Sequence, residues 1–376
     1  MHDLSPVLRP IEDARGLPND HYLSEEIYQA ERERLFVKGW AAIAFGADAP
    51  EPGDAYPVEL FGMPLLVVRD REGSIRVFEN VCRHRGMILV DAPKRVGGSI
   101  RCPYHSWCYG LDGRLAATPH VAGPGQNMHP SIRRDELGLN AIRHVVWRDI
   151  IFVNISGDAP EFEEYISDIE HAWADLDQPV HGGGADSQFE LLVECNWKLA
   201  VENYCESYHL PWVHPGLNSY SRLEDHYNVI GEGFSGQGTR AYRQLTGKGG
   251  ARFPDFEGLG QKWEKGAEYF SLYPNVLLGA HRDHAYAIIL LPLGVDRTLE
   301  RVMLHYASVE TDTDLRVDNA ALWRSVFEED VFVVEGMQRG RRAPHFDGGR
   351  FSPAMDSPTH AFHAWVAQRM DGGKIA

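Results

Sequence analysis

Two stretches in the first half of the chain carry short apolar runs separated by polar turn residues, a pattern that predicts β-strands. Residues 64–80, PLLVVRDREGSIRVFEN, place two apolar runs around a turn that contains Gly73, which indicates a β-hairpin. Residues 144–155, HVVWRDIIFVNI, predict a second strand pair. With the Gly and Pro turns around them, these runs predict a small β domain at about residues 40–155.

Helical spacing of apolar residues dominates several other stretches. Residues 24–36, SEEIYQAERERLF, begin with a Ser and an acidic first turn, which is typical of a helix start. Residues 160–177 place Phe162, Ile166, Ile169 and Trp173 on one helical face. After residue 196 helices and strands mix, with late helices expected at 317–342 and 358–370. The pattern as a whole predicts an α+β protein.

Length and charge narrow the class of protein. A chain of 376 residues exceeds the size at which one hydrophobic core usually keeps growing, so two domains are expected. The formal net charge of -17 argues against nucleic acid or an anionic membrane as a partner, and it is compatible with a cationic substrate. No stretch approaches 18 apolar residues, and charges stand where a signal peptide needs an apolar region. We therefore expect a cytoplasmic protein.

Five cysteines form no dense disulfide framework, and Cys108, Cys195 and Cys205 are expected to be buried thiols. The remaining two each stand beside a histidine, as Cys82-x-His84 and, 17 residues later, Cys102-x-x-His105. Thiolate and neutral imidazole are common ligands of zinc and of iron–sulfur clusters. Finger-type zinc sites pair like with like, whereas mixed pairs suit a [2Fe–2S] cluster in which one iron takes two sulfurs and the other two imidazoles. The cysteines would then hold one iron and the histidines the other.

The segments CRHRG and CPYHSWCYGLDGRL around these residues resemble the Rieske signature, including its Gly and Pro loop residues. The resemblance covers about residues 40–155. Imidazole ligation raises the reduction potential of such a cluster above that of all-cysteine clusters. The rest of the chain should therefore supply an electron acceptor that is more oxidising.

Residues 196–216, NWKLAVENYCESYHLPWVHPG, predict a helix with one buried face, formed by Trp197, Val201, Tyr204 and Tyr208. Because Pro211 disfavours helix at the residue before it, this helix is expected to end near His209. On an unbroken helix, His209 and His214 would point apart. The break lets both rings converge on one metal ion.

Two histidines and one carboxylate form the facial triad of non-haem Fe(II) oxygenases, and residues 319–342 offer four candidate carboxylates. Asp330 lies within about 60° of an apolar helical stripe, made by Trp323, Val326, Phe327, Val334 and Met337. An unpaired buried carboxylate costs several kcal/mol, which metal coordination removes. The neighbouring acids lie on the flanks or the opposite side and are expected to be solvated, namely Glu328, Glu329 and Glu335.

ENYCESYHLPWVH followed by FEEDVFVVEGMQRG is similar to the catalytic domain of Rieske non-haem iron oxygenase α subunits. This resemblance implies that His209, His214 and Asp330 bind a mononuclear Fe(II), and that the domain has a helix-grip fold with an antiparallel sheet. It also implies that Glu206, on the same helical face as His209, bridges that residue to His105 of a neighbouring chain in a head-to-tail homotrimer. Glu at this position resembles the α-only oxygenases of carnitine and glycine betaine.

The expected organisation is an N-terminal helical segment at 1–39 that packs on the catalytic domain, a Rieske domain at 40–157 and a catalytic domain at 158–376. The resemblance implies a terminal oxygenase that uses O2 and electrons from a separate NAD(P)H-dependent flavin or ferredoxin reductase. Its reaction would be hydroxylation or N-demethylation of a small organic substrate, preferably a quaternary ammonium or N-methyl compound. The alternatives are hydroxylation of an arene or aromatic acid, a Rieske electron-transfer protein, and a zinc-stabilised binding module.

Two further features bear on ligand binding. GEGFSG at 231–236 matches a dinucleotide fingerprint, but no apolar helix follows, so a flexible loop near the active-site mouth is expected instead. Six aromatic residues could line a pocket for an arene or, through cation–π contact, a quaternary ammonium group. We expect each of these residues to pack in the core. The six residues are Trp212, Tyr220, Tyr269, Phe270, Tyr273 and Tyr286.

Overall fold

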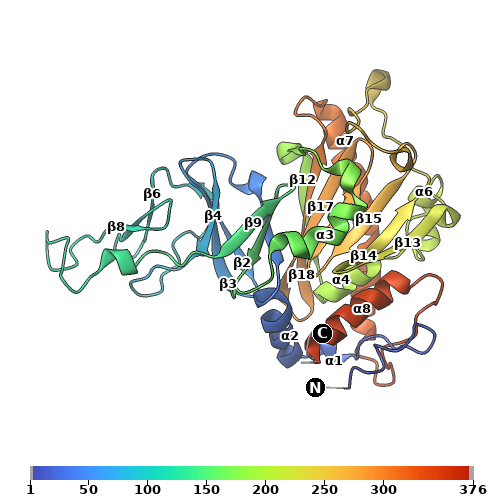
Figure 1. Ribbon diagram of the computed structural model, residues 1–376, viewed down its shortest axis with the longest axis horizontal. Coiled ribbons are helices and arrows are strands. Elements are labelled where there is room, and N and C mark those ends of the chain that lie inside the picture. Colours follow the sequence, from blue (N-terminus) through green and yellow to red (C-terminus); the bar gives the residue numbers. More distant parts are fainter. Residues whose placement is uncertain (1–2, 372–376) are drawn as a thin grey trace. The chain divides into compact units, whose positions relative to one another are not determined.

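A computed structural model describes residues 3–371, and the chain divides into two compact units (Figure 1). The smaller unit is Ala42–Asp158, and the larger unit combines Met1–Ala41 with Ala159–Ala376. The expected boundaries, 39/40 and 157/158, lie close to these divisions. The ends of the expected domains, residues 1–2 and 372–376, lie outside the described residues.

The smaller unit is built from short strands in three sheets. The sheets have the strand orders β4-β3-β2-β5, β6-β7-β8 and β1-β10-β9. Both strand pairs expected from the apolar runs are present, as the antiparallel pairs β3–β4 and β9–β10. The strands are β1 (Ala41–Phe45), β2 (Asp54–Leu60), β3 (Met63–Arg69), β4 (Ile75–Glu79), β5 (Lys94–Arg95), β6 (Ser99–Arg101), β7 (Cys108–Gly110), β8 (Leu115–Ala117), β9 (Arg143–Trp147) and β10 (Ile150–Asn154).

The larger unit contains an antiparallel eight-stranded sheet of order β11-β18-β17-β16-β15-β14-β13, with β12 paired to β18. Gly231 and Gly233 do not belong to a flexible loop, so that expectation is wrong. They stand at the tight turn of the hairpin β13–β14, where Gly233 takes a φ of 77° that glycine adopts without steric cost. The strands are β11 (His181–Gly182), β12 (Gln188–Val193), β13 (His226–Gly231), β14 (Phe234–Thr239), β15 (Ala267–Leu272), β16 (Val276–Ala280), β17 (His284–Gly294) and β18 (Arg297–Tyr306).

Helices of the larger unit pack on this sheet and on each other: α7 contacts β12, α4 contacts β15 and β17, and α8 contacts β13 and β14 (Figure 1). The side chain of Asp312 caps α7 by accepting the N–H of Leu315 at 2.8 Å, so this helix begins earlier than the apolar pattern indicated. The helices are α1 (Asp20–Leu23), α2 (Glu25–Glu31), α3 (Phe162–Ala172), α4 (Trp197–Tyr204), α5 (Leu210–Val213), α6 (Pro215–Asn218), α7 (Thr313–Gly340) and α8 (Ser357–Met370).

Shorter helical segments complete the architecture. The π-helix Arg32–Val37 continues α2 and contacts α8, so the N-terminal segment packs on the larger unit. The 3-10 turns are Gly46–Asp48, Arg134–Glu136, Ala174–Leu176, Gly184–Ser187, Leu223–Asp225, Lys248–Gly250 and Gln261–Trp263. Over residues 3–371, no helix has both the length and the apolar character needed to cross a membrane.

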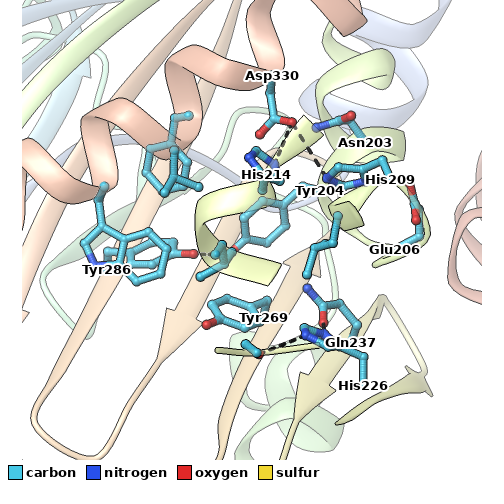
Figure 2. A pocket seen from close by; sticks show the side chains of 16 residues that line it. Asn203, Tyr204, Glu206, His209, His214, His226, Gln237, Tyr269, Tyr286 and Asp330 are labelled. Atoms are coloured by element: carbon cyan, nitrogen blue, oxygen red, sulfur yellow. Dashed lines mark hydrogen bonds and ion pairs between the residues drawn. The ribbon is translucent and has the colours of Figure 1, made fainter. Parts of the chain in front are cut away.

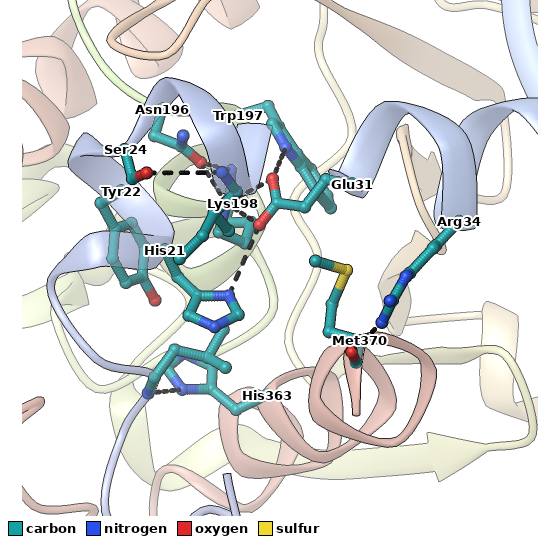
Figure 3. A network of polar contacts seen from close by, with 12 residues as sticks. His21, Tyr22, Ser24, Glu31, Arg34, Asn196, Trp197, Lys198, His363 and Met370 are labelled. Carbon is teal, nitrogen blue, oxygen red and sulfur yellow. Dashed lines mark hydrogen bonds and ion pairs between the residues drawn. The ribbon is translucent and has the colours of Figure 1, made fainter. Parts of the chain in front are cut away.

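A buried ion pair fastens the N-terminal segment to α4 (Figure 3). Lys198 Nζ lies 2.7 Å from Glu31 Oε1, and both side chains are fully buried. The other carboxylate oxygen of Glu31 accepts the indole N–H of Trp197 at 3.0 Å. Because buried charges are tolerated only when they are paired and hydrogen bonded, these contacts fix the start of α4 against α2. The C-terminal end of α4 leads to the histidines predicted to bind iron.

Candidate metal centres and substrate pocket

The two cysteine loops of the smaller unit have the same backbone geometry. In each loop the cysteine N–H donates to the carbonyl five residues later at 2.8 Å, and the cysteine carbonyl accepts from the N–H four residues later at 3.0 Å. These partners are Met87 and Gly86 for Cys82, and Trp107 and Ser106 for Cys102. The two loops therefore form equivalent backbone turns, although the Cys-His spacing in the sequence differs between them.

The fourth position after each cysteine lies in the left-handed region, with φ of 74° at Gly86 and 57° at Ser106. Glycine adopts this conformation freely, whereas it is uncommon and costly for serine. A non-glycine residue is kept there only where the surrounding structure requires the turn, so the geometry of the second loop is fixed by more than local preference.

Thiols and imidazoles occupy different environments in these loops. Cys82 and Cys102 are buried in the core of the smaller unit, whereas His84 is exposed and its ring centroid lies 4.7 Å from that of His105. Burial raises the pKa of the Cys82 thiol, and the Cys102 sulfur raises it further, so a cation is needed to hold Cys82 as a thiolate. His105 Nδ1 is buried without a hydrogen-bond partner in the described part of the chain. Two thiols and two imidazoles fit the donor set of a Rieske [2Fe–2S] cluster, in which the cysteines would hold one iron and the histidines the other.

Helix α4 ends at Tyr204, five residues before the expected end at His209. The side chain of Glu206 accepts the N–H of Tyr208, which stabilises a turn here instead of further helix. Tyr208 is 43% exposed, so it does not continue the buried face of α4 as predicted. Glu206 and His209 both lie beyond the end of α4, so the prediction that they share one helical face is wrong.

The two histidines flank one short helix. His209 is the N-cap of α5 and His214 its C-cap, so the single turn Leu210–Val213 sets their separation. Pro211 lies in the first turn of α5, where its missing N–H costs nothing, so it does not exclude helix at Leu210 as expected. The ring centroids of the histidines are 5.1 Å apart and the rings are steeply inclined, at 69°.

Each of these rings donates its Nδ1 proton to a carboxylate. His209 Nδ1 lies 2.7 Å from Glu206 Oε1, and His214 Nδ1 lies 2.7 Å from Glu329 Oε2. Because a carboxylate only accepts hydrogen bonds, both neutral rings then carry a lone pair at Nε2. Figure 2 shows Asp330 on the Nε2 side of both rings, with Glu206 on the opposite side of His209.

Three electron-pair donors converge at this point. Asp330 Oδ1 lies 3.0 Å from His214 Nε2 and 3.7 Å from His209 Nε2, and one ligand atom from each residue falls within 4.8 Å of the others. Asp330 Oδ1 is buried without a hydrogen-bond partner among the described residues. A divalent cation removes the mutual repulsion of these lone pairs, and two histidines with one carboxylate are the donor set of non-haem Fe(II).

The carboxylates of Asp330 and Glu329 also affect the protonation of His214. Burial disfavours the charged imidazolium of His214, but the hydrogen bonds and charges of Asp330 and Glu329 outweigh burial and raise the pKa of His214. The negative field that would hold a proton here would equally hold a metal ion. Glu329 was expected to be a solvated helix acid. The structure corrects this expectation, because Glu329 contacts His214. The angular position of Glu329 on the helix did not predict this contact, and its position directly before Asp330 was the one indication in the sequence.

A pocket opens beside the three residues, with a space of about 490 Å³ including its mouth (Figure 2). Its walls combine five aromatic rings with the carboxylates of Glu206 and Asp330. Aromatic faces carry negative charge density and suit either arenes or quaternary ammonium groups. The five rings are Tyr204, Tyr269, Tyr286, Trp323 and Phe327.

The six aromatic residues considered from sequence have different positions. Tyr269 and Tyr286 line this pocket, and Tyr220 lines an adjoining cavity. Phe270 and Tyr273 are buried in the core as expected, whereas Trp212 is 71% exposed and lies against Tyr208. Three of the pocket rings, Tyr204, Trp323 and Phe327, had been assigned only to buried helix faces.

Two stacked histidines stand behind the pocket walls, with ring centroids 4.2 Å apart. His284 Nε2 accepts the indole N–H of Trp323 at 2.8 Å, and its Nδ1 donates to Asp283 Oδ1 at 2.8 Å. His281 Nε2 hydrogen bonds the hydroxyl of Tyr269 at 3.1 Å. The turn between β16 and β17 thus fixes the orientation of two aromatic walls, and nothing in the local sequence indicated this network.

Comparison with known families supports both metal centres. Residues 176–372 match the family described as "Ring hydroxylating alpha subunit (catalytic domain)", and residues 39–132 match "Rieske [2Fe-2S] domain". Choline monooxygenase from the chloroplast of Spinacia oleracea is 30% identical, over 98% of this chain and 81% of the relative. The carnitine monooxygenase oxygenase subunit of Acinetobacter pittii (strain PHEA-2) is 24% identical, over 88% and 86%.

Solved structures share the fold. The quaternary ammonium Rieske monooxygenase CntA in complex with L-carnitine aligns with a TM-score of 0.79 at 22% identity, over 98% of this chain and 99% of the other. Naphthalene 1,2-dioxygenase from Rhodococcus sp. bound to indole aligns with a TM-score of 0.76 at 18% identity, over 99% and 98%. These likenesses confirm the expected α+β class, with a small all-β Rieske domain and a helix-grip catalytic domain.

The catalytic-domain match decides between the functional classes left open by the sequence, because neither an electron-transfer protein nor a zinc-stabilised binding module accounts for it. The two domains imply two cofactors, a Rieske [2Fe–2S] cluster and a mononuclear iron, and the curated relatives are monooxygenases. The chain therefore belongs to the Rieske non-haem iron oxygenases, as a member of the ring-hydroxylating α-subunit family.

Proposed function

We propose that this α subunit oxidises a methyl group, or a carbon close to the nitrogen, of a small quaternary ammonium compound. The observation that carries this proposal is the pocket beside His209, His214 and Asp330, which is lined by five aromatic residues together with Glu206 and Asp330. Aromatic faces attract a quaternary ammonium group by about 0.5–2 kcal/mol per contact. Neither lysine nor arginine is among the residues that line this pocket.

The metal ligands are part of the same proposal. Cys82 and Cys102 hold one iron of the Rieske cluster, and His84 and His105 hold the other, within the unit Ala42–Asp158. Buried thiols beside the exposed imidazole of His84 and the partly buried one of His105 support this arrangement, since it leaves the imidazole side more accessible to a redox partner.

The triad of His209, His214 and Asp330 holds the mononuclear Fe(II) within the larger unit, supported by the convergence of their electron pairs. When bound, this iron activates O2 with electrons delivered by the cluster. The chain's own residues contribute orientation: Glu206 and Glu329 keep the Nδ1 protons of the two histidines, so that both Nε2 atoms remain available to the metal.

The overall reaction consumes one O2, two electrons and two protons. One oxygen atom enters a C–H bond of the substrate to give an alcohol, and the other leaves as water. A hydroxymethyl group on a quaternary nitrogen then breaks its C–N bond and releases formaldehyde, while the hydroxyl proton is transferred to the amine. The aromatic walls hold the ammonium group and exclude water, so that the reacting carbon stays next to the iron.

Electrons reach the iron, in our proposal, from the cluster of a neighbouring copy in a head-to-tail homotrimer. Glu206 contacts His209 through Oε1 and retains 14% side-chain exposure, which leaves it accessible to an imidazole from another chain. Two exposed aromatic residues beside it, Tyr208 and Trp212, are suited to burial at such an interface. A separate NAD(P)H-dependent flavin or ferredoxin reductase would feed the cluster.

Two curated relatives support the substrate class, since one is named for choline and the other for carnitine, both quaternary ammonium compounds. An arene is the second candidate, because the same rings could stack on it and the fold is also that of naphthalene 1,2-dioxygenase.

The deciding experiment measures substrate-stimulated O2 uptake with a surrogate reductase, on a panel of quaternary ammonium compounds and arenes, with formaldehyde detection. Quaternary ammonium compounds should stimulate uptake and give product in proportion to it. Stimulation by arenes alone would overturn the proposal. Metal analysis should give about three iron atoms and about two acid-labile sulfides per chain, whereas zinc in place of iron would contradict the ligand assignment.

A further inference from the structure

A second cavity of about 350 Å³ adjoins the pocket beside the predicted iron ligands. The two spaces share four lining residues, Leu217, Ser221, Tyr269 and Trp323, so they meet at the rings of Tyr269 and Trp323. We call the second space the distal chamber. Its own walls include Tyr220, Tyr242, Arg243, Leu245, Asn319 and Leu322.

The two ends of this combined cavity differ in charge. The residues lining the iron-side pocket include the carboxylates of Glu206 and Asp330 and no lysine or arginine. Those lining the distal chamber include Arg243, an exposed residue at its edge, and no aspartate or glutamate. In a chain of net charge -17, a chamber whose lining carries a cation but no acid is a local reversal of sign.

Arg243 is not neutralised by an acid. Among the described residues, no carboxylate forms an ion pair or hydrogen bond with it, and its guanidinium lies 6.0 Å from the ring centroid of Tyr220. An arginine with free N–H groups at the edge of a cavity is the preferred protein partner of a carboxylate, because its planar fork can donate two parallel hydrogen bonds.

A buried amide in the same chamber also lacks a partner. Asn319 is fully buried, yet neither atom of its side-chain amide has a hydrogen-bond partner in the described part of the chain. The hydroxyl of Tyr306, which hydrogen bonds Ser187 at 3.1 Å, interacts with this amide, but no hydrogen bond of standard geometry joins the two. Leaving a buried amide unsatisfied costs about 1–3 kcal/mol, so this group indicates a polar ligand or water in the chamber.

One buried acid stands behind the chamber. Asp283 is not among its lining residues, and its Oδ1 accepts hydrogen bonds from the Tyr242 hydroxyl at 2.9 Å and from His284 Nδ1 at 2.8 Å. Both donors therefore turn toward Asp283, whose Oδ2 is buried without a hydrogen-bond partner among the described residues. The polar side chains of the chamber that can meet a ligand include Arg243, Asn319 and Tyr220.

Helix α7 sets the length of the combined cavity. Asn319, Trp323, Phe327 and Asp330 recur at helical spacing and line one face from the distal chamber to the iron ligand. Asn319 and Asp330 are eleven positions apart, which corresponds to about 16.5 Å along the helix axis at 1.5 Å per residue. A ligand that reaches from the iron-side pocket into the distal chamber must therefore separate its two ends by several bonds.

We infer that the distal chamber binds the carboxylate of a zwitterionic substrate, with Arg243 and Asn319 as its recognition residues, while the quaternary ammonium end lies in the aromatic pocket beside the iron. This inference rests on the proposed function and narrows the substrate class from quaternary ammonium compounds in general to those that also carry a carboxylate. The substrate is a quaternary ammonium carboxylate whose two charges are separated by more than one methylene group, rather than a simple alcohol such as choline.

The test compares kcat/KM for choline, glycine betaine and γ-butyrobetaine in the iron-loaded enzyme with a surrogate reductase. We expect γ-butyrobetaine to exceed both others. Arg243→Gln should lower the ratio of kcat/KM for γ-butyrobetaine to that for choline by roughly tenfold, mainly through KM, and Arg243→Lys should restore part of it. Arg240→Gln is the matched control, because Arg240 is a neighbouring arginine that lies over Tyr227 and lines neither space.

The outcomes separate this inference from the proposed function. Turnover of choline at least equal to that of γ-butyrobetaine, with the ratio unchanged in Arg243→Gln, would overturn the distal carboxylate site and leave the proposed function standing. Absence of turnover with every quaternary ammonium compound would overturn the proposed function itself. As an independent check, Asn319→Asp should lower kcat/KM for γ-butyrobetaine more than that for choline, because it places a negative charge in the chamber.

Discussion

The carboxylate of Glu329 accepts a hydrogen bond from Nδ1 of His214 at 2.7 Å, while the next residue, Asp330, faces Nε2 of the same ring at 3.0 Å. Two successive acids on α7 thus hold the two nitrogen atoms of one imidazole. A carboxylate that accepts the distal proton of a metal-bound histidine fixes the tautomer and increases the basicity of the ligand.

Glu329→Gln should therefore weaken binding of the mononuclear iron by roughly 10–100-fold, because the amide is a weaker acceptor for the Nδ1 proton. The measurement is an Fe(II) titration of enzyme depleted of mononuclear iron, with the visible spectrum of the cluster as an internal reference. Glu328→Gln is the matched control, since Glu328 is exposed and contacts Arg324. Equal iron affinity in both variants would contradict a role for Glu329 in holding His214.

Asp330→Ala should remove the mononuclear iron and leave the cluster in place. The iron content should fall by about one atom per chain, the cluster spectrum should be unchanged, and turnover should be lost. Because the cluster residues lie in the smaller unit and Asp330 in the larger one, the cluster serves as the folding control. Normal turnover in this variant would rule out Asp330 as an iron ligand.

Glu206→Gln should retain both metals but slow the arrival of electrons at the mononuclear iron. The change keeps the size of the side chain and removes the negative charge that contacts His209 at 2.7 Å. The measurement is the rate of cluster oxidation in a single turnover of pre-reduced enzyme with substrate and O2. Glu328→Gln again provides a control, and an unchanged rate in Glu206→Gln would refute the bridging role.

The ion pair between Glu31 and Lys198 gives a prediction about stability. Lys198→Met should lower the free energy of unfolding by about 3–5 kcal/mol, because it removes the nearest cation from a fully buried carboxylate and leaves His21, at 3.6 Å, as its ion-pair partner. The double variant Glu31→Gln/Lys198→Met should recover much of this loss, since the amide is neutral and can still accept the indole N–H of Trp197. Urea unfolding followed by circular dichroism measures both.

Lys94→Met is the control for that series. Lys94 contacts Asp91 at 3.3 Å, but both side chains are well exposed, so the loss should stay below about 1 kcal/mol. An equal loss for Lys198→Met and Lys94→Met would show that the buried pair does not stabilise the fold.

Glu202 predicts a pH dependence of stability. Burial alone would raise its pKa, but His363, Arg341 and the Tyr22 hydroxyl outweigh burial and lower the pKa of Glu202 to about 2, from 4.5 for an ordinary glutamate. The stabilisation is therefore complete above pH 4.5 and is lost as the pH falls toward 2. Between pH 5 and 3.5 it should decrease by about 1 kcal/mol.

Glu202→Gln should remove this component, so the wild-type protein should lose stability more steeply than the variant over the same pH interval. Urea titrations at several pH values measure the difference between the two proteins, which cancels contributions from all other groups. Parallel pH profiles for the two proteins would show that Glu202 does not have a lowered pKa in the folded state.

Sequence reasoning succeeded where a pattern reflects a local physical requirement. The strand pairs β3–β4 and β9–β10 follow from short apolar runs around turns, and all four apolar residues predicted on one face of α3 are buried. Asp330 was selected because a carboxylate within an apolar stripe needs a partner, and the structure brings it next to His209 and His214.

Errors arose where side chains or turns compete with local preference. The carboxylate of Glu206 takes a backbone N–H and helps to end α4 early, and Pro211 enters the first turn of a new helix instead of excluding it. Gly231 and Gly233 stand at a hairpin turn and Gly236 lies within β14, because β14 pairs with β13 on one side and with β15 on the other. Apolar periodicity contains none of these contacts.

The sequence by itself determined the types of donor atom and their local spacing, because thiolate, imidazole and carboxylate groups are identified by residue type and by neighbours a few positions away. Only the tertiary structure decided which groups meet across long separations: Glu329 with His214, His284 with Trp323, and Arg243 in one chamber with Asn319. The physical reason is that such pairings depend on the packing of α7 against the sheet and α4, and no single segment of the chain carries that information.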